Sequence, residues 1–344
     1  MTELSSDRFT LVGVNGSPYS RKVRAILRYR HLPYNWVLRT TRNNRLIEHM
    51  KPFLIPVLFY PGEKNGLLDS TPIAHQLEEA YPDNRSIMPP DPALSFFNHL
   101  IEDMADEWLT KAMFHYRWMY DADIQYAKQW IIDERFPDAS DAEREQEMQA
   151  FSDRQIGRMP LVGCTEENRQ CVENTYHTIL EILEGQVNQH QYLFGSRPAL
   201  ADFALFGQLC VLAEDPTPQS IMREKAQQVE SWLRVLDDAS GISGSWQEKS
   251  TPSRTVEKLL EMAGRAYLPF LDANRKALES NEDSFSLEIE GAPYRQGTFK
   301  YQLKCLRSLQ QHFASLEEST KADVIRSLES HNCLHILSQD FDKR

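Results

Sequence analysis

The chain has 344 residues, of which 41% are hydrophobic, 26% charged and 10% aromatic, and its formal net charge is −12. This composition is typical of a globular protein, and the length predicts two domains with room for an appendage, since a domain usually holds about 100–200 residues. The acidic balance argues against nonspecific nucleic-acid binding, which needs cations that replace phosphate counterions. No apolar run approaches the about 18 residues of a membrane span, and residues 1–8 are polar, so we expect a cytoplasmic protein without a membrane partner.

The five cysteines are scattered and form no C-x-x-C pair, which argues against a zinc ribbon and a disulfide scaffold. They are Cys164, Cys171, Cys210, Cys305 and Cys333. We expect them to be reduced and structural. His331, Cys333 and His335 alternate, but positions two apart do not share a helix face, so we expect no metal site.

Charge is distributed unevenly along the chain. Residues 1–85 hold 12 Lys and Arg against 8 Asp and Glu, a net of +4, which leaves −16 for the remainder. A basic first segment in an acidic protein suits a small anionic ligand. The alternative interpretation is a solvated helix face made by Arg21, Arg24 and Arg28.

The first elements read as strand, turn and helix. Phe9 to Val14 is an apolar, β-branched run, and Asn15-Gly16 after it is a turn signal. Ser17-Pro18 then opens a helix, with a hydroxyl at the N-cap and proline at the first helical position. The following strand, short helix, two strands and helix are predicted at Tyr34–Leu38, Arg42–Met50, Pro56–Tyr60, Leu67–Leu68 and Asp69–Tyr81. The resulting order is βαβαββα.

Prolines at 82, 89, 90 and 92 indicate an interdomain linker, because proline neither continues a helix nor donates to a strand ladder. Beyond it the apolar periodicity is helical. Helices are predicted at Leu94–Tyr120, Ile124–Phe136, Glu166–Val187, Asp202–Leu212 and Ile221–Leu236, with an isolated strand at Phe285–Ile289 and a last helical region over residues 303–316. We therefore expect an α/β first domain at 1–85, an all-helical domain at 92–265 and a C-terminal extension at 266–344.

Three local features recur at matching intervals along a thioredoxin-like order. They are Ser17-Pro18-Tyr19-Ser20, Ile55-Pro56 and Asp69-Ser70. With this ordered set the chain resembles the glutathione transferase superfamily, especially its serine- and cysteine-type tau, zeta and omega classes. The likeness extends from residue 9 to about 240, and the tail beyond it is similar to that of long bacterial glutathione-transferase-like proteins.

The resemblance implies that Ser17 stabilises the thiolate of bound glutathione. The physical chemistry agrees, because a hydroxyl at a helix N-terminus lies among unpaired backbone N–H groups and the positive end of the helix dipole. A thiol of ordinary pKa is only a few per cent ionised at neutral pH, so lowering that pKa activates it. The alternative is that Ser17 is only an N-cap.

The other two features are implied to hold glutathione. Pro56 matches the family's cis-proline, which lets the backbone of Ile55 pair with the cysteinyl part, and Asp69 and Ser70 match the residues that bind the γ-glutamyl group. A plain capping pair is the alternative for the last two. Arg39, Arg42 or Arg45 is expected to meet the glycyl carboxylate.

The second domain carries a further family segment, from Tyr192 to Phe203, in which Asp202 belongs to a buried capping motif. Ala199 stands where the family has serine, so we expect Asp202 to be structural and its usual cap to be incomplete. A helical stripe with Trp108, Lys111, His115 and Trp118 is predicted to line the co-substrate pocket with Tyr19, or to belong to the interdomain core.

The resemblance implies an enzyme that joins the glutathione thiolate to a small hydrophobic electrophile, with glutathione as substrate and no metal. The alternatives are a noncatalytic binding module of the same fold and a glutathione-dependent oxidoreductase, whose chemistry needs a cysteine at position 17 or 20. A homodimer is expected from the family alone. The extension either packs on the helical domain or forms a lid over the pocket.

Overall fold

The computed structural model describes residues 4–82, 85–187 and 192–339. The chain divides into two compact units. Unit 1 comprises Met1–Ile87, Tyr116–Gly157 and Phe203–Ser243, and unit 2 comprises Met88–His115, Arg158–Asp202 and Gly244–Arg344. Each unit thus interleaves three segments, whereas the predicted domains follow chain order, and the predicted boundaries stay a prediction.

Unit 1 contains a four-stranded sheet in the order β2-β1-β3-β4. β1 runs parallel to β2 and antiparallel to β3, and β3 is antiparallel to β4. The strands are β1 (Phe9–Gly13), β2 (Tyr34–Leu38), β3 (Val57–Phe59) and β4 (Leu67–Leu68). The predicted thioredoxin-like fold is confirmed.

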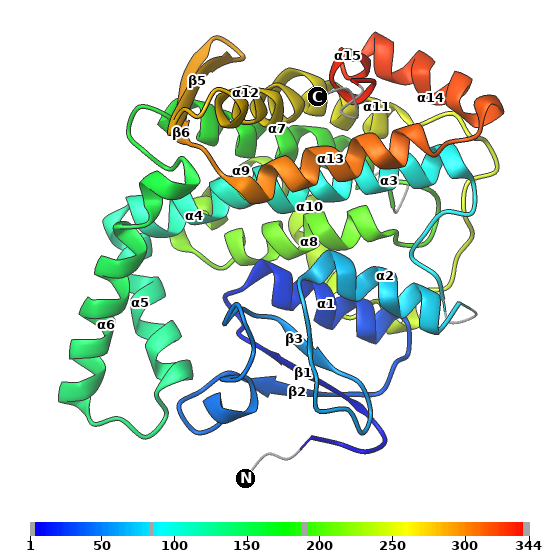
Figure 1. Cartoon of the computed structure of the whole chain (residues 1–344). Helices are drawn as coiled ribbons and strands as arrows, with labels where there is room; N and C mark the ends of the chain where they lie inside the picture. Colours follow the sequence, from blue (N-terminus) through cyan, green and yellow to red (C-terminus); the bar gives the residue numbers. More distant parts are fainter. Residues whose placement is uncertain (1–3, 83–84, 188–191, 340–344) are drawn as a thin grey trace. The chain divides into compact units, whose positions relative to one another are not determined.

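Two helices of unit 1 pack with this sheet, α1 (Pro18–Tyr29) and α2 (Ser70–Ala80) (Figure 1). β1 is buried along its whole length, and the apolar side of α1 includes the fully buried Val23 and Ile26. Burial of such aliphatic side chains stabilises the layer by about 1.5–3 kcal/mol each. Packing of α1 against the buried strand β1 therefore holds the strands of the sheet in place.

The segment predicted as a short helix at Arg42–Met50 contains only a single 3₁₀ turn, η1 (Asn44–Leu46). The side chain of Asn43 donates to the carbonyl of Leu38 at 2.6 Å and accepts from the N–H of Thr40 at 2.9 Å. Asparagine that bonds to nearby backbone offers an alternative to helical pairing, which explains why the helix does not extend.

The remaining helices of unit 1 include one that the sequence did not predict, α6 (Asp141–Ile156), which packs against α5 (Asp121–Arg135). Its N-terminus is a complete capping box between Ser140 and Glu143. The predicted helix Ile221–Leu236 is two helices, because Ala226 leaves the helical region at φ −147 and ψ 56. The other elements are α5 (Asp121–Arg135), α9 (Pro216–Lys225), α10 (Gln227–Asp237) and η4 (Ala239–Gly241).

Two helices have residues in both units, α4 (Thr110–Met119) and α8 (Leu200–Leu212). The predicted long helix Leu94–Tyr120 is three elements, since a π-helical turn, η2 (Ala105–Leu109), separates α3 (Pro92–Met104) from α4. In unit 2, α13 lies along α3 (Figure 1), with the rings of Phe96 and Phe313 5.9 Å apart. The unit's other helices are α3 (Pro92–Met104), η2 (Ala105–Leu109), η3 (Met159–Val162), α7 (Arg169–Val187), α11 (Arg254–Met262), η5 (Ala263–Tyr267), α12 (Leu268–Glu279), α13 (Lys300–Ala314), α14 (Glu318–Ser330) and α15 (Leu334–Leu337).

The strand predicted as isolated at Phe285–Ile289 is half of an antiparallel hairpin, β5 (Ser284–Ile289) with β6 (Ala292–Gly297). The second strand contains Pro293 and Gly297, two residue types that are depleted in strands, so the sequence pattern did not predict it. Its buried Gln296 accepts from the ammonium of Lys111 at 2.8 Å, which stabilises a polar side chain on the inner face.

Asp202 retains a capping role although the serine hydroxyl is missing. It is the third residue of α8 and fully buried, and its two carboxylate oxygens accept from the N–H groups of Ala199 at 2.9 Å and Leu193 at 3.1 Å. The cap is therefore incomplete only because Ala199 has no hydroxyl group. The bonds that the Asp202 carboxylate accepts are present. Burial raises the pKa of Asp202 to about 7, and the backbone N–H groups oppose that rise.

We expect the stability difference between wild type and Asp202→Asn to depend on pH. A carboxyl group whose pKa is raised on folding favours the folded state when protonated, and this advantage is lost as pH rises from about 4 to about 7. Over that range wild type should lose up to about 4 kcal/mol relative to the variant. Urea unfolding at several pH values measures this, and parallel profiles would show that Asp202 titrates normally.

Candidate functional site

The register of the sheet in unit 1 brings the three predicted features to one edge. Val12 pairs with Val57, and Val57 pairs with Leu68. Because β3 runs opposite to β1 and β4, the turn after β1, the residue before β3 and the residue after β4 all lie at this edge. These positions hold the Ser17 turn, Pro56 and Asp69, in that order.

Ser17 is the N-cap residue of α1, in extended conformation, and its Oγ accepts from the N–H of Ser20 at 3.2 Å. Pro18 at the first helical position presets the backbone for the helix. The side chain is half-buried, and no described group accepts its hydroxyl proton. Ser17 Oγ therefore caps the helix as an acceptor, and its hydroxyl proton can donate a hydrogen bond to a ligand.

The other predicted residues have specific backbone settings. The Ile55-Pro56 peptide bond is cis, as the resemblance implies. Asp69 is the N-cap of α2 at φ +73, a region that non-glycine residues rarely adopt, and its Oδ1 accepts from the N–H of Thr71 at 3.3 Å. Ser70 is 2% exposed at the start of the same helix. Asp69 is thus a cap whose backbone is held in an uncommon conformation.

The structure separates the three arginines considered for a carboxylate, and Arg45 is exposed in the 3₁₀ turn η1. Arg42 forms an exposed ion pair with Asp138. Arg39 is half-buried directly after β2, and its N–H donates to the carbonyl of Gly13 at 2.8 Å. Since β2 is parallel to β1, Arg39 lies at the same edge as the Ser17 turn. Arg39 is therefore better placed than Arg42 to receive an anion.

The arginines of α1 do not form the solvated face that was one interpretation of them. Arg21 and Arg24 each have a guanidinium nitrogen within 3.3 Å of Asp237 Oδ1, and Arg28 lies 3.1 Å from Oδ2. Burial opposes ionisation of Asp237, but the three cations outweigh it and lower the pKa of this carboxyl. These three positive charges are engaged within unit 1 and are not directed to a small anion.

Helical segments distant in sequence hold the turn before Ser17. The buried Arg117 donates through Nη1 to the carbonyl of Gly16 and through Nε to Asp215, both at 2.8 Å. Asn15 donates from its backbone N–H and its amide to Glu134 at 3.2 and 2.7 Å.

The glycine at position 16 leaves room for this close packing. A Cβ added there would come within 2.6 Å of the Trp130 ring, so the turn approaches α5 as closely as glycine allows. Sequence reasoning missed these supporting residues, because nothing local pairs positions about a hundred residues apart.

Three of the residues predicted to line a co-substrate pocket are buried in unit 2. Trp108, Lys111 and His115 are 1%, 3% and 0% exposed. The ammonium of Lys111 donates to the carbonyl of Val162 at 3.0 Å, and His115 Nε2 lies 2.9 Å from Glu173. These contacts favour the packing interpretation.

Lys111 has a titration property that follows from this burial. Burial lowers its pKa to about 8, since aromatic rings replace water around the ammonium. Those rings belong to Trp108, Phe270 and Tyr294. Tyr19 is half-buried on α1 in unit 1, so its role at the pocket stays a prediction.

Within the described part of the chain, no group of three His, Cys, Asp or Glu side chains is placed to hold a metal ion. None of the five cysteines forms a disulfide bond, and all five are buried. Burial raises the pKa of the Cys333 thiol to about 12, which makes it a poor ligand and nucleophile. Over the same residues no helix has the length and apolar character needed to span a bilayer.

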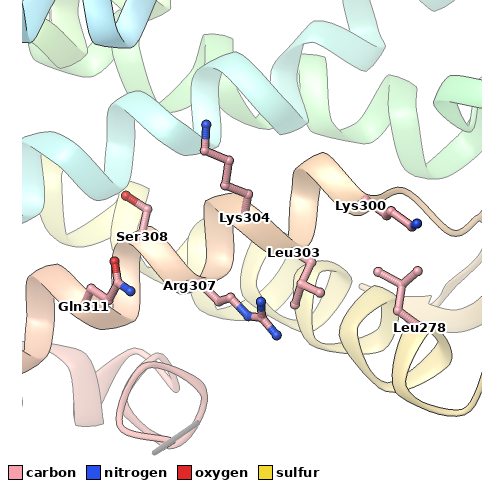
Figure 2. Close-up of a pocket in the computed structure, with 7 residues that line it drawn as sticks. All are labelled: Leu278, Lys300, Leu303, Lys304, Arg307, Ser308 and Gln311. Carbon is pink, nitrogen blue, oxygen red and sulfur yellow. The ribbon is translucent and has the colours of Figure 1, made fainter. Parts of the chain in front are cut away.

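Unit 2 has a groove of about 620 Å³ along α13 (Figure 2). It is lined by Leu278, Lys300, Leu303, Lys304, Arg307, Ser308 and Gln311. Figure 2 shows Lys304 and Arg307 directed to opposite sides of the helix, so their charges do not converge on one point. The groove contains none of the predicted site residues.

Residues 11–85 match the protein family described as "Glutathione S-transferase, N-terminal domain". No curated protein matches the chain. Solved structures with detectable likeness include a glutathione S-transferase from Rhodospirillum rubrum F11, with 18% identity, a TM-score of 0.43, and coverage of 73% of this chain and 91% of that one.

Two further structures have similar scores. A beta-etherase from Sphingobium sp. has 17% identity and a TM-score of 0.45, over 74% of this chain and 98% of that one. A glutathione S-transferase from Methylobacillus flagellatus, with glutathione bound, has 18% identity and a TM-score of 0.41, over 67% and 96%. At these values the structural likenesses carry no functional argument.

Proposed function

We propose that the chain, whose residues 11–85 match the glutathione S-transferase N-terminal domain, binds glutathione and conjugates it to a small hydrophobic electrophile. The observation that supports the proposal most is the sheet register, which brings Ser17, Pro56 and Asp69 to one edge. Ser17 is the catalytic residue of this proposal. Ile55, Pro56, Asp69 and Ser70 bind glutathione.

In the proposed mechanism the α1 N-terminus and the Ser17 hydroxyl stabilise the thiolate. The thiol proton leaves to solvent, and a sulfur lone pair forms a C–S bond to the electrophilic carbon. The leaving group departs with its bonding electron pair, so the charge is balanced. Ser17 donates a hydrogen bond throughout and forms no covalent bond. Lowering the thiol pKa by about two units costs under 3 kcal/mol of differential stabilisation.

Glutathione itself has two charged ends to be recognised. Asp69 at the start of α2 faces the γ-glutamyl ammonium, and the hydroxyl and N–H of Ser70 face its carboxylate. Arg39 receives the glycyl carboxylate, since it is half-buried at the same edge while Arg42 is paired with Asp138. The proposal extends to a cytoplasmic location and to a homodimer, and sedimentation of the purified protein checks the dimer.

We expect Asp69→Ala to weaken glutathione binding by about 1–3 kcal/mol, the value of a charge-assisted hydrogen bond. Calorimetry with wild type and variant measures this. The matched control is Asp91→Ala, because Asp91 caps α3 through the N–H groups of Ala93 and Leu94. It should leave the glutathione affinity unchanged. Equal dissociation constants in wild type and Asp69→Ala would show that Asp69 only caps α2 and does not bind glutathione.

The same titration separates the alternatives. Glutathione binding without turnover of any electrophile would point to a noncatalytic binding module. Absence of binding at millimolar glutathione would contradict both the conjugating enzyme and the noncatalytic binding module. An oxidoreductase would need a nucleophilic cysteine at the helix start, and positions 17 and 20 are serine.

A further inference from the structure

Three arginines of unit 1 lie beside the sheet edge that holds the Ser17 turn, Pro56 and Asp69. Arg39 follows β2, Arg135 ends α5 and Arg154 lies in the last turn of α6. The N–H of Thr41 donates to the carbonyl of Arg135 at 3.0 Å, which joins the loop after β2 to the end of α5. The loop after β2 and the paired helices α5 and α6 therefore lie together in unit 1.

Aromatic rings orient the guanidinium groups. The Cζ atoms of Arg135 and Arg154 lie 5.9 and 5.2 Å from the centroid of the same ring, Phe151. Side chains on a helix lean toward its N-terminus, so Arg135 on α5 and Phe151 on the antiparallel α6 lean toward each other. Arg39 Cζ lies 4.0 Å from the centroid of the Phe53 ring. The two helical arginines therefore both lie against one aromatic side chain.

The three cations differ from neighbouring arginines in their ion pairing. Arg42 and Arg144 are paired with Asp138 and Asp133, whereas among the described residues none of the three takes part in an ion pair. Burial lowers the pKa of Arg39, and the charges of Arg135 and Arg154 lower it further.

Burial and the charge of Arg154 likewise lower the pKa of Arg135, and the charge of Glu147 opposes them. Like charges held together at a partly desolvated surface favour an anionic ligand.

The cluster adjoins the proposed catalytic turn and an apolar surface. Glu134, which precedes Arg135, accepts from Asn15, two residues before Ser17. Phe53 and Leu54 precede Ile55-Pro56 and are 39% and 57% exposed. A ligand that contacts both features would carry an acidic group on an apolar body.

We propose that Arg135 and Arg154 bind an acidic group of the acceptor substrate, so that the preferred electrophile is an organic anion such as an arene carboxylate. This inference rests on the proposed function for its role in turnover. It does not depend on that function for binding. Arg39 remains with the glycyl carboxylate of glutathione and lies at the boundary between the two ligands.

Two matched probe pairs test the proposal. Binding is measured by calorimetry without glutathione, with nitrobenzoate against the neutral nitrobenzamide. Turnover is measured with glutathione, using chloronitrobenzoate against chloronitrobenzamide, where the C–S bond forms as chloride leaves. Wild type should bind nitrobenzoate more tightly than nitrobenzamide. In Arg135→Gln and in Arg154→Gln this preference should fall about 10-fold, the effect of one charge-assisted bond at a partly exposed site.

Arg223→Gln is the control, because Arg223 is an exposed arginine on α9 paired with Glu230. It should retain the preference, and Arg154→Gln should retain wild-type glutathione affinity. Arg154 is exposed, so its variant tests the proposal even where Arg135→Gln fails to fold. Equal binding of both probes to wild type, or an unchanged preference in Arg154→Gln, overturns the anion site. If wild type turned over neither acceptor but kept the binding preference, the proposed function and the acceptor role would be overturned, and the anion site itself would remain.

Discussion

Replacing Arg117 by Leu is expected to lower the free energy of unfolding by about 3–5 kcal/mol, the cost of breaking a buried ion pair by removing one partner. The side chains of Arg117 and Asp215 are 4% and 0% exposed and meet at 2.8 Å. Burial raises the pKa of Asp215, and the Arg117 cation opposes that rise. Without Arg117 the carboxylate loses its counterion and the Gly16 carbonyl loses its donor. Urea unfolding measures the change.

The pH dependence of this loss has a defined sign. With its pKa raised further, Asp215 in the variant favours folding when protonated, so the deficit should be larger at pH 8 than at pH 5. In the double variant Arg117→Leu/Asp215→Leu most of the stability should return, because no unpaired charge remains in the core. Arg42→Leu removes an exposed pair with Asp138 and should cost about 1 kcal/mol or less. A double variant as unstable as the single one would locate the effect in the Gly16 turn instead.

Much of the sheet of unit 1 was predictable because its signals are local. β2 and β4 have the predicted limits, since alternation and turn residues bound them on both sides. α6 was missed because its exposed, charged sequence has no apolar stripe, although the Ser140 capping box marked its start. The helices α9 and α10 were merged, because one periodicity runs through Ala226 and only its backbone angles separate them.

The candidate site divides in the same way. Ser17, Pro56 and Asp69 were predicted from local motifs and their order along the chain, and the pairing of β1, β3 and β4 brings them to one edge. The contacts of Arg117 with Gly16 and of Glu134 with Asn15 join segments 101 and 119 residues apart, and only the folded chain specifies them. The aromatic stripe with Trp108 was ambiguous, since packing and pocket lining use the same side chains at the same spacing.

Ser17→Ala is expected to retain glutathione affinity and to lose conjugation by about 10- to 1000-fold, the range for removing one preorganised donor. The reason lies in the geometry of the cap. Ser17 Oγ accepts from the N–H of Ser20, and its proton is available to a thiolate that the α1 dipole favours. Initial rates with an electrophilic arene and calorimetry with glutathione separate the chemistry from binding.

Loss of the cap itself must be separated from loss of the donor. Ser253→Ala removes an equivalent cap on α11, where Oγ accepts from the N–H of Val256 at 3.3 Å, and each variant should lose about 0.5–2 kcal/mol of stability. Only Ser17→Ala should lose conjugation.

Ser17→Cys should make the protein's own thiolate a nucleophile, because the same dipole lowers the pKa of that cysteine. It would attack a mixed disulfide of glutathione, form a new protein disulfide and release the other thiolate. Intact conjugation in Ser17→Ala, with no disulfide reactivity in Ser17→Cys, would mean that residue 17 does not face the sulfur. Asn15 and Tyr19, on either side of it, would then be the residues to test.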